Sequence, residues 1–94
     1  MLDIRIGETG NIVITGRFDA SQEERVRAFL DTIKAPSIVD CSGLDYISSA
    51  GLGVLLATQK RLGPFGGGLK LVNLNKHLRD LFRFSGFDRI FEIA

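Results

Sequence analysis

The chain has few of the residues that build catalytic and metal sites. Its 94 residues include one cysteine, Cys41, one histidine, His77, and no tryptophan. A single cysteine excludes an internal disulfide, and together with one histidine it provides too few ligands for a zinc site. We therefore expect no bound metal and no cofactor. Cys41 follows an apolar stretch, which predicts a buried, unreactive thiol of the kind found in a reducing cytoplasm.

Charge of one sign and long apolar runs are also scarce. The net charge is +1 at neutral pH, which gives no field to attract nucleic acid or an anionic membrane, so we expect no direct nucleic-acid binding. No apolar run reaches the roughly 18 residues of a membrane span, and the first residues lack the basic and apolar regions of a signal peptide. A cytoplasmic protein without membrane insertion is expected.

What the chain does contain is typical of one globular domain. Hydrophobic residues make up 45% of the sequence and charged residues 24%, a balance that allows a modest apolar core. The sequence has no repeats, low-complexity tracts or linkers that would mark a boundary. We therefore expect a single domain over residues 1–94.

The first part of the chain predicts a hairpin followed by a helix. Isoleucine-rich segments on both sides of a Gly-Glu-Thr-Gly turn at residues 7–10 indicate two antiparallel strands, the second ending at Gly16. A helix is expected over about residues 20–34, and either Asp19 or Ser21 could cap it, since Gln22 and Glu24 follow them at capping-box spacing. Apolar side chains recur there at i, i+3, i+4 and i+7: Val26, Phe29, Leu30 and Ile33.

The middle of the chain predicts a strand, a turn and a helix. Residues 37–41 are apolar without alternation, which is typical of a central strand covered on both faces. Residues 43–47 are expected to form a polar turn, after which residues 50–62 read as a helix with Ser49 as its N-cap. Gly63 is expected to end this helix in the left-handed conformation.

The last part predicts a loop, a strand, a helix and a short final strand. The glycine-rich residues 65–68 lack the Lys-Ser or Lys-Thr ending of a phosphate-binding loop, so a plain flexible loop is expected. Leu69, Leu71 and Leu74 alternate as in a strand, Asn73 or Asn75 precedes a helix that closes at Ser85 and Gly86, and residues 87–93 are strand-like.

Strand and helix alternate from Ile12 onward. This order predicts the α/β class, with a mixed sheet of four to five strands packed against three or more helices. The opening hairpin makes the sheet mixed.

An enzymatic function finds little support in the residues. Ser49, His77 and Asp40 are the residue types of a hydrolase triad. The serine has no Gly-x-Ser-x-Gly elbow around it, and His77 falls in the first turn of a polar helix face, where a solvated histidine is the default. We expect no enzyme and no catalytic residues.

The stretch from Ile38 to Leu56 has a pattern that resembles a known family. Ile-Val-Asp-Cys-Ser, then Leu-Asp-Tyr-Ile, then Ser-Ser-Ala-Gly-Leu-Gly-Val-Leu-Leu is similar to the signature of the STAS domain of bacterial anti-sigma factor antagonists. Residues 16–19 and 78–90 extend the resemblance to nearly the whole chain. It implies a single STAS-like layer and a protein-interaction module that regulates transcription.

The resemblance also implies a mechanism. A family antagonist binds an anti-sigma factor that is also a serine kinase of the GHKL type, and so releases the sigma factor. The kinase then phosphorylates a helix-capping serine, the complex separates, and a PP2C-type phosphatase resets the antagonist. By the motif, the acceptor here is Ser49, with Ser48 as the second choice. The partner-binding positions it implies are Asp19, Ser48, Ser49, Ala50, Gly51 and Leu52.

One departure from the family pattern keeps an alternative open. Partner-switching members most often have Asp immediately before the acceptor serine, whereas this chain has Ser48. The alternative is a permanent, unphosphorylated structural subunit of a transport or signalling complex, for example of a lipid-transport ATPase. The family commonly has a further C-terminal helix. The apolar surface left without it predicts either a loose C-terminal end or a homodimer contact.

Overall fold

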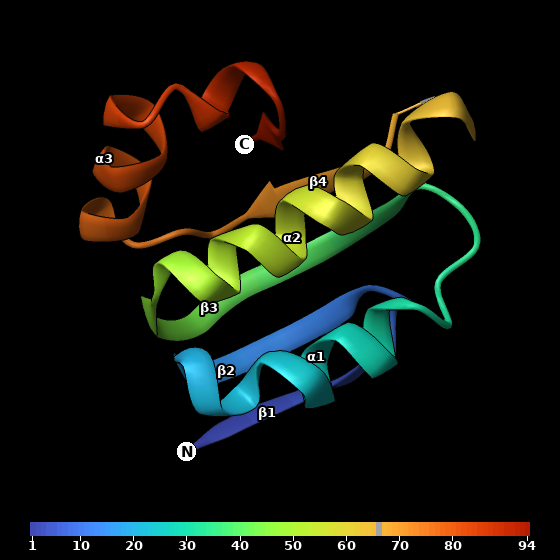
Figure 1. Ribbon diagram of the computed structural model, residues 1–94, viewed down its shortest axis with the longest axis horizontal. Coiled ribbons are helices and arrows are strands. Elements are labelled where there is room, and N and C mark those ends of the chain that lie inside the picture. Colours follow the sequence, from blue (N-terminus) through green and yellow to red (C-terminus); the bar gives the residue numbers. More distant parts are fainter. Residues whose placement is uncertain (66) are drawn as a thin grey trace.

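The strands form one mixed sheet in which the order along the chain is also the order in space (Figure 1). The computed structural model describes residues 1–65 and 67–94. The first two strands are antiparallel, and every later neighbour is parallel. This confirms the predicted α/β class and the mixed sheet. The strands are β1 (Leu2–Ile6), β2 (Ile12–Phe18), β3 (Ser37–Ile47), β4 (Leu69–Val72) and β5 (Glu92–Ile93).

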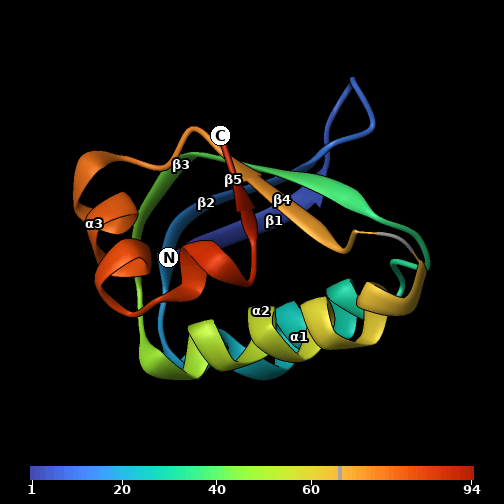
Figure 2. The same cartoon turned by 90° about the horizontal axis from the view of Figure 1, so that it is seen from above.

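Helices cover one face of this sheet. Two of them lie side by side beneath it, and the third lies at its end, while none of the helices in the described residues lies over the opposite face (Figure 2). The prediction that the central strand is covered on both faces is therefore wrong, and Ile38 is 37% exposed. The helices are α1 (Glu23–Leu30), α2 (Ser49–Leu62) and α3 (Lys76–Phe84), with 3-10 turns η1 (Ala20–Gln22), η2 (Gly63–Phe65) and η3 (Phe87–Arg89).

The core lies between the sheet and the helices. As the sequence predicts, Val26 and Leu30 of α1 are fully buried, and Phe29 and Ile33 pack against the core from its edge. Cys41 of β3 is 2% exposed. Burial, and then the charge of Asp40, raise the pKa of its thiol to about 12, so the thiol stays protonated at neutral pH.

Strand β3 continues through the segment where the sequence predicts a turn. Its pairing with β2 skips one residue of β3 at two places, between Val13 and Thr15 and between Gly16 and Arg17. Each of these places is a β-bulge, where β3 has one extra residue. At each bulge, two residues that point away from the core are followed by an apolar residue that points into it. From Cys41 onward the buried residues of β3 are therefore three apart, at Cys41, Leu44 and Ile47, whereas Val39 and Cys41 keep the two-residue spacing of a regular strand. Because apolar and polar residues do not alternate in this part of β3, the sequence does not show the period-two pattern that indicates a strand.

Two further boundaries differ from the sequence prediction. Strand β2 runs to Phe18 rather than to Gly16. The first α-helix is shorter than predicted, because η1 occupies its expected start and the chain after Leu30 makes short i→i+3 bonds, from Thr32 N to Phe29 O and from Ile33 N to Leu30 O.

The ends of α2 and α3 are formed differently from each other. Gly63 has φ −50° and ψ −45°, so the predicted left-handed stop is wrong, and the chain passes directly into η2. The predicted loop at 65–68 includes Gly66, which lies outside the described residues. Helix α3 ends as predicted, at Ser85 and then Gly86 with φ +77°.

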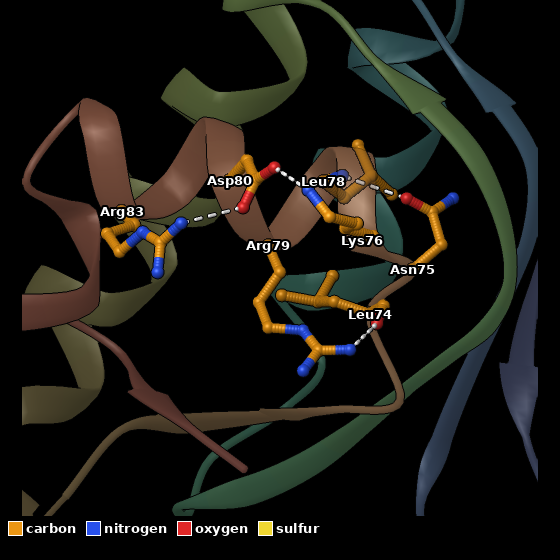
Figure 3. Close-up of polar contacts among 7 residues, drawn as sticks. All are labelled: Leu74, Asn75, Lys76, Leu78, Arg79, Asp80 and Arg83. Atoms are coloured by element: carbon orange, nitrogen blue, oxygen red, sulfur yellow. Dashed lines mark hydrogen bonds and ion pairs between the residues drawn. The ribbon is translucent and has the colours of Figure 1, made fainter.

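Asn75 lies immediately before α3, and its side-chain oxygen accepts a hydrogen bond from Leu78 N at 2.8 Å. Asn75 is therefore the cap, and Asn73 instead has φ +63°. On the outer side of the helix, Asp80 accepts from Lys76 at 2.8 Å and from Arg83 at 3.0 Å (Figure 3). The hydrogen bond from Lys76 is the main cause that lowers the pKa of Asp80.

The final strand is much shorter than predicted. Residues 87–89 form η3, and only Glu92–Ile93 pair with β4. The rings of Phe87 and Phe91 pack on Phe82, with ring centroids 6.2 Å and 5.9 Å away. This aromatic cluster holds residues 87–91 against α3. The alternation of apolar residues in the sequence predicts a strand here and does not indicate this packing.

Arg61 joins the two helices that cover the sheet. Its guanidinium donates to Leu30 O, the last carbonyl of α1, at 2.8 Å and to Ile33 O, just beyond the helix, at 2.9 Å. Leu30 O also accepts from Ile33 N. We expect Arg61→Ala to lower the free energy of unfolding by about 1–3 kcal/mol, because two partly buried carbonyls lose a charged donor. Urea unfolding measures this, with the exposed neighbour Lys60→Ala as control. Equal midpoints for the two variants would contradict the assignment.

Candidate functional site

The carboxyl ends of β2 and β3 meet at one edge of the molecule. There Ser48 N donates to Phe18 O at 2.9 Å, so the segment that leaves β2 is bonded to the segment that starts α2. The two strand ends run side by side into η1 and α2 in both views (Figures 1 and 2). The structure thereby brings Asp19 next to the serine pair. Ligands and partners of open sheets commonly bind at this end of the strands.

The N-cap of α2 is Ser48, and the prediction of Ser49 as the cap is wrong by one residue. Ser48 is extended, with φ −85° and ψ 171°, and its hydroxyl accepts from Gly51 N at 3.1 Å. Because β3 continues to Ile47, only Ser48 separates the strand from the helix. Ser49 is the first helical residue and is exposed, whereas Ser48 is half-buried.

The next residues of α2 pack closely on the strand ends. Gly51 is buried, and a Cβ added to it would lie 2.8 Å from Cγ1 of Ile47 and 3.1 Å from Phe18 O. Glycine is therefore needed for the helix to start against both strands. Ala50 and Leu52 are half-buried beside it. They leave part of their apolar surface open at the start of the helix.

Asp19 caps η1. Its carboxylate accepts from Ser21 N at 3.0 Å and from the Ser21 hydroxyl at 2.5 Å. The bond from the Ser21 hydroxyl is the main cause that holds the pKa of Asp19 below its usual value, with smaller contributions from Arg17 and the N-terminal amine. Asp19 is therefore ionised at neutral pH, beside the start of α2.

Of the three residues of the hypothetical hydrolase triad, Asp40 is bonded to other groups. Asp40 accepts from Ser42 N at 3.0 Å and from Nδ2 of Asn73 at 3.1 Å. The Asn73 bond is the main cause that lowers the pKa of Asp40. His77 is exposed in the first turn of α3. Within the described part of the chain, no hydrogen bond joins these side chains to Ser49, and no cluster of side chains is suited to hold a metal ion.

Two hollows of the described residues lie away from these strand ends. A hollow of about 370 Å³ lies at the opposite end of the strands, lined among others by Asn11, Ser37 and Lys70. A second hollow of about 200 Å³ lies between α3 and the last strand. Neither includes Asp19 or the serine pair. The site is thus an open surface that carries a hydroxyl, a carboxylate and apolar side chains, which suits contact with another protein better than turnover of a small molecule.

A pair of side chains beside this surface was not found by sequence reasoning. The guanidinium of Arg17 lies over the ring of Tyr46, 4.3 Å from its centroid. The bulge between Gly16 and Arg17 sets these two residues opposite each other. The sequence does not indicate this pair, because the pairing of Arg17 with Tyr46 depends on the register of two strands that are far apart in the sequence.

A family model described as "Mlab, STAS domain" matches residues 4–92. The chain belongs to the STAS domain family. Within the described residues of this STAS domain, none of the helices has both the length and the apolar composition needed to span a lipid bilayer.

Several other proteins are similar to this STAS domain. BtrV of Bordetella bronchiseptica, whose provisional name is anti-sigma factor antagonist, is 42% identical over 72 residues, which are 77% of this chain and 62% of BtrV. The chain therefore spans less than two thirds of that relative. An anti-sigma factor antagonist from Mycobacterium paratuberculosis has a TM-score of 0.85 at 19% identity, with 100% of this chain and 86% of that chain covered.

A third similar structure is the Bacillus cell fate determinant SpoIIAA, solved in its phosphorylated form. Its TM-score is 0.69 at 24% identity, and the match covers 100% of this chain and 91% of that chain. At such identities these structures show the shared STAS fold.

Proposed function

We propose that this STAS domain is an anti-sigma factor antagonist that works by partner switching. In its unmodified form it binds an anti-sigma factor that is also a GHKL-type serine kinase. Phosphorylation of Ser49 ends the binding, and a PP2C-type phosphatase restores it. The observation that carries the proposal is the exposed Ser49 hydroxyl at the start of α2, beside the ionised Asp19 on an open surface. The family membership and the likeness to BtrV support it.

The physical basis of the switch is a local change of charge. A phosphate adds about −1.5 to −2 charges at neutral pH. At the first residue of a helix the free amides and the helix dipole favour an anion, so the fold of the antagonist tolerates the phosphate. The partner meets the same charge at a contact that also includes Ala50 and Leu52, where desolvation and repulsion of acidic groups oppose binding. The antagonist itself turns over no substrate and works in the cytoplasm.

Ser49 is favoured over Ser48 as the acceptor. The Ser48 hydroxyl already accepts from Gly51 N and is half-buried, whereas the Ser49 hydroxyl is exposed. A kinase that reached Ser48 would have to break the cap, which stabilises a helix by about 0.5–2 kcal/mol. Asp19 contributes a fixed carboxylate to the surface that the kinase recognises.

The second candidate is a permanent structural subunit of a transport or signalling complex, for example of a lipid-transport ATPase. It is favoured by Ser48, which stands where partner-switching relatives most often have Asp. In that case the same surface binds a partner without being modified. Asp19, Gly51 and Leu52 then act only in assembly.

Phosphate mapping separates the two candidates. The protein is incubated with ATP and each GHKL-type kinase encoded near its gene, and intact mass and fragment masses are measured. We expect one phosphate, on Ser49; Ser48→Ala should still be modified and Ser49→Ala should not. Modification confined to Ser48 would move the switch by one residue. Stable binding without modification by any of these kinases would support the permanent subunit.

A further inference from the structure

The guanidinium of Arg17 lies at the edge of the proposed partner surface, and the proposed phosphorylation switch assigns it no role. Arg17 and Tyr46 occupy the ends of β2 and β3, one residue before the Phe18 carbonyl that bonds Ser48 N. Both side chains reach solvent: Arg17 is exposed, and Tyr46 is 36% exposed. They point away from the core, because their neighbours Phe18 and Ile47 are buried.

The backbone is bent to place these two side chains together. The β3 strand advances by two residues, from Leu44 to Tyr46, while β2 advances by one, from Gly16 to Arg17. Gly16 has φ +95° and lies against the carbonyl of Met1. Bulges of this kind re-aim side chains and are frequent beside functional sites. Here the bulge sets the Tyr46 ring under the guanidinium.

The stacked guanidinium is held in place and left free to bind. Its Cζ lies 4.3 Å from the centroid of the Tyr46 ring, and this contact restricts the conformation of the side chain before any partner arrives. Within the described residues, the guanidinium of Arg17 has no hydrogen-bond acceptor and no ion-paired carboxylate. Its positive charge contributes to the lowered pKa of Asp19 without a hydrogen bond between the two side chains. The N–H groups along the edge of a guanidinium form a rigid fork that fits a carboxylate with two parallel hydrogen bonds.

We propose that Arg17, held on Tyr46, binds a carboxylate of the anti-sigma kinase and is a main determinant of affinity at this surface. The inference rests on the proposed function and adds the chemistry of the partner: an Asp or Glu side chain that docks beside the serine pair. Arginine and tyrosine are, with tryptophan, the residue types enriched among the few residues that dominate binding energy in interfaces. Phosphorylation of Ser49 then adds negative charge close to the place where the partner's carboxylate must sit.

The first test measures affinity by calorimetric titration with the kinase that modifies or binds the wild-type protein. We expect Arg17→Gln to weaken binding about tenfold, and Arg17→Lys to recover only part of that loss because an ammonium lacks the fork. Tyr46→Phe should keep the affinity and Tyr46→Leu should lower it. Arg5→Gln removes the same charge from β1 and serves as control. The salt dependence of binding should be weaker for Arg17→Gln alone.

The second test identifies the carboxylate. Arg17→Glu is titrated against kinase variants in which single surface Asp or Glu residues are replaced by Lys. One such kinase variant should bind the wild-type antagonist weakly. The same kinase variant should bind the Arg17→Glu antagonist at least about tenfold more tightly than the unmodified kinase binds Arg17→Glu. If Arg17→Gln and Arg5→Gln bind equally well at low and high salt, the inference is overturned while the proposed function stands. If the wild-type protein binds no GHKL-type kinase, both the proposed function and this inference are contradicted.

Discussion

Ser49→Asp is expected to lower the affinity for the anti-sigma kinase by at least about thirtyfold, which corresponds to roughly 2 kcal/mol. The reason is that Ser49 is exposed at the start of α2, so a carboxylate there reaches the contact surface directly. Ser49→Ala is expected to bind as tightly as the wild type and to form a complex that ATP no longer dissociates. Titration calorimetry measures the first effect, and gel filtration with and without ATP measures the second.

The control for added charge is Ser85→Asp, an exposed serine at the far end of α3. It should leave the affinity unchanged. An acidic residue in the first turn of a helix is stabilising, so Ser49→Asp should unfold at the same or a higher temperature than the wild type. Loss of binding together with a clearly lower melting temperature would show that the variant is misfolded and would remove the support for a local switch. Unchanged binding would contradict the switch itself.

Much of the fold could be predicted from the sequence, because most elements have a regular apolar pattern. The hairpin around residues 7–10, the buried stripe of α1 and the cap of α3 follow from local rules. The second half of β3 does not, since its two bulges change the spacing of Cys41, Leu44 and Ile47. Strands are recognised in a sequence by apolar residues two apart, so buried residues three apart do not indicate a strand. The same bulges hide the Arg17–Tyr46 pair, which exists only when the strand register is known.

The candidate site shows a similar limit. The resemblance to the STAS family singled out Asp19 and the serine pair, but not how they are held together. That depends on the hydrogen bond from Ser48 N to Phe18 O, which joins segments far apart in the chain. The cap was misplaced by one residue because a doubled serine satisfies the local rule at either position, and only the end of β3 at Ile47 decides between them.

Two glycines in the first turns of α2 are expected to respond in opposite ways to alanine. At Gly51 the added methyl would lie 2.8 Å from Ile47 Cγ1 and 3.1 Å from both Phe18 O and Phe18 Cγ, whereas at Gly53 it meets no atom within 4 Å. Gly51→Ala should therefore lower the free energy of unfolding by about 1–3 kcal/mol. Gly53→Ala should raise it by roughly 0.5–1 kcal/mol, because glycine inside a helix loses more backbone entropy on folding than alanine does.

Urea unfolding of the two variants measures these changes, and each serves as the control for the other because the substitution is the same. The functional consequence concerns Gly51. To relieve the contact, α2 must move away from the ends of β2 and β3, which separates Ser49 from Asp19. Gly51→Ala should then be phosphorylated more slowly than Gly53→Ala even where both proteins are fully folded, as judged by circular dichroism. Equal stability and equal phosphorylation rates would mean that the close packing of α2 on the strand ends does not position the site.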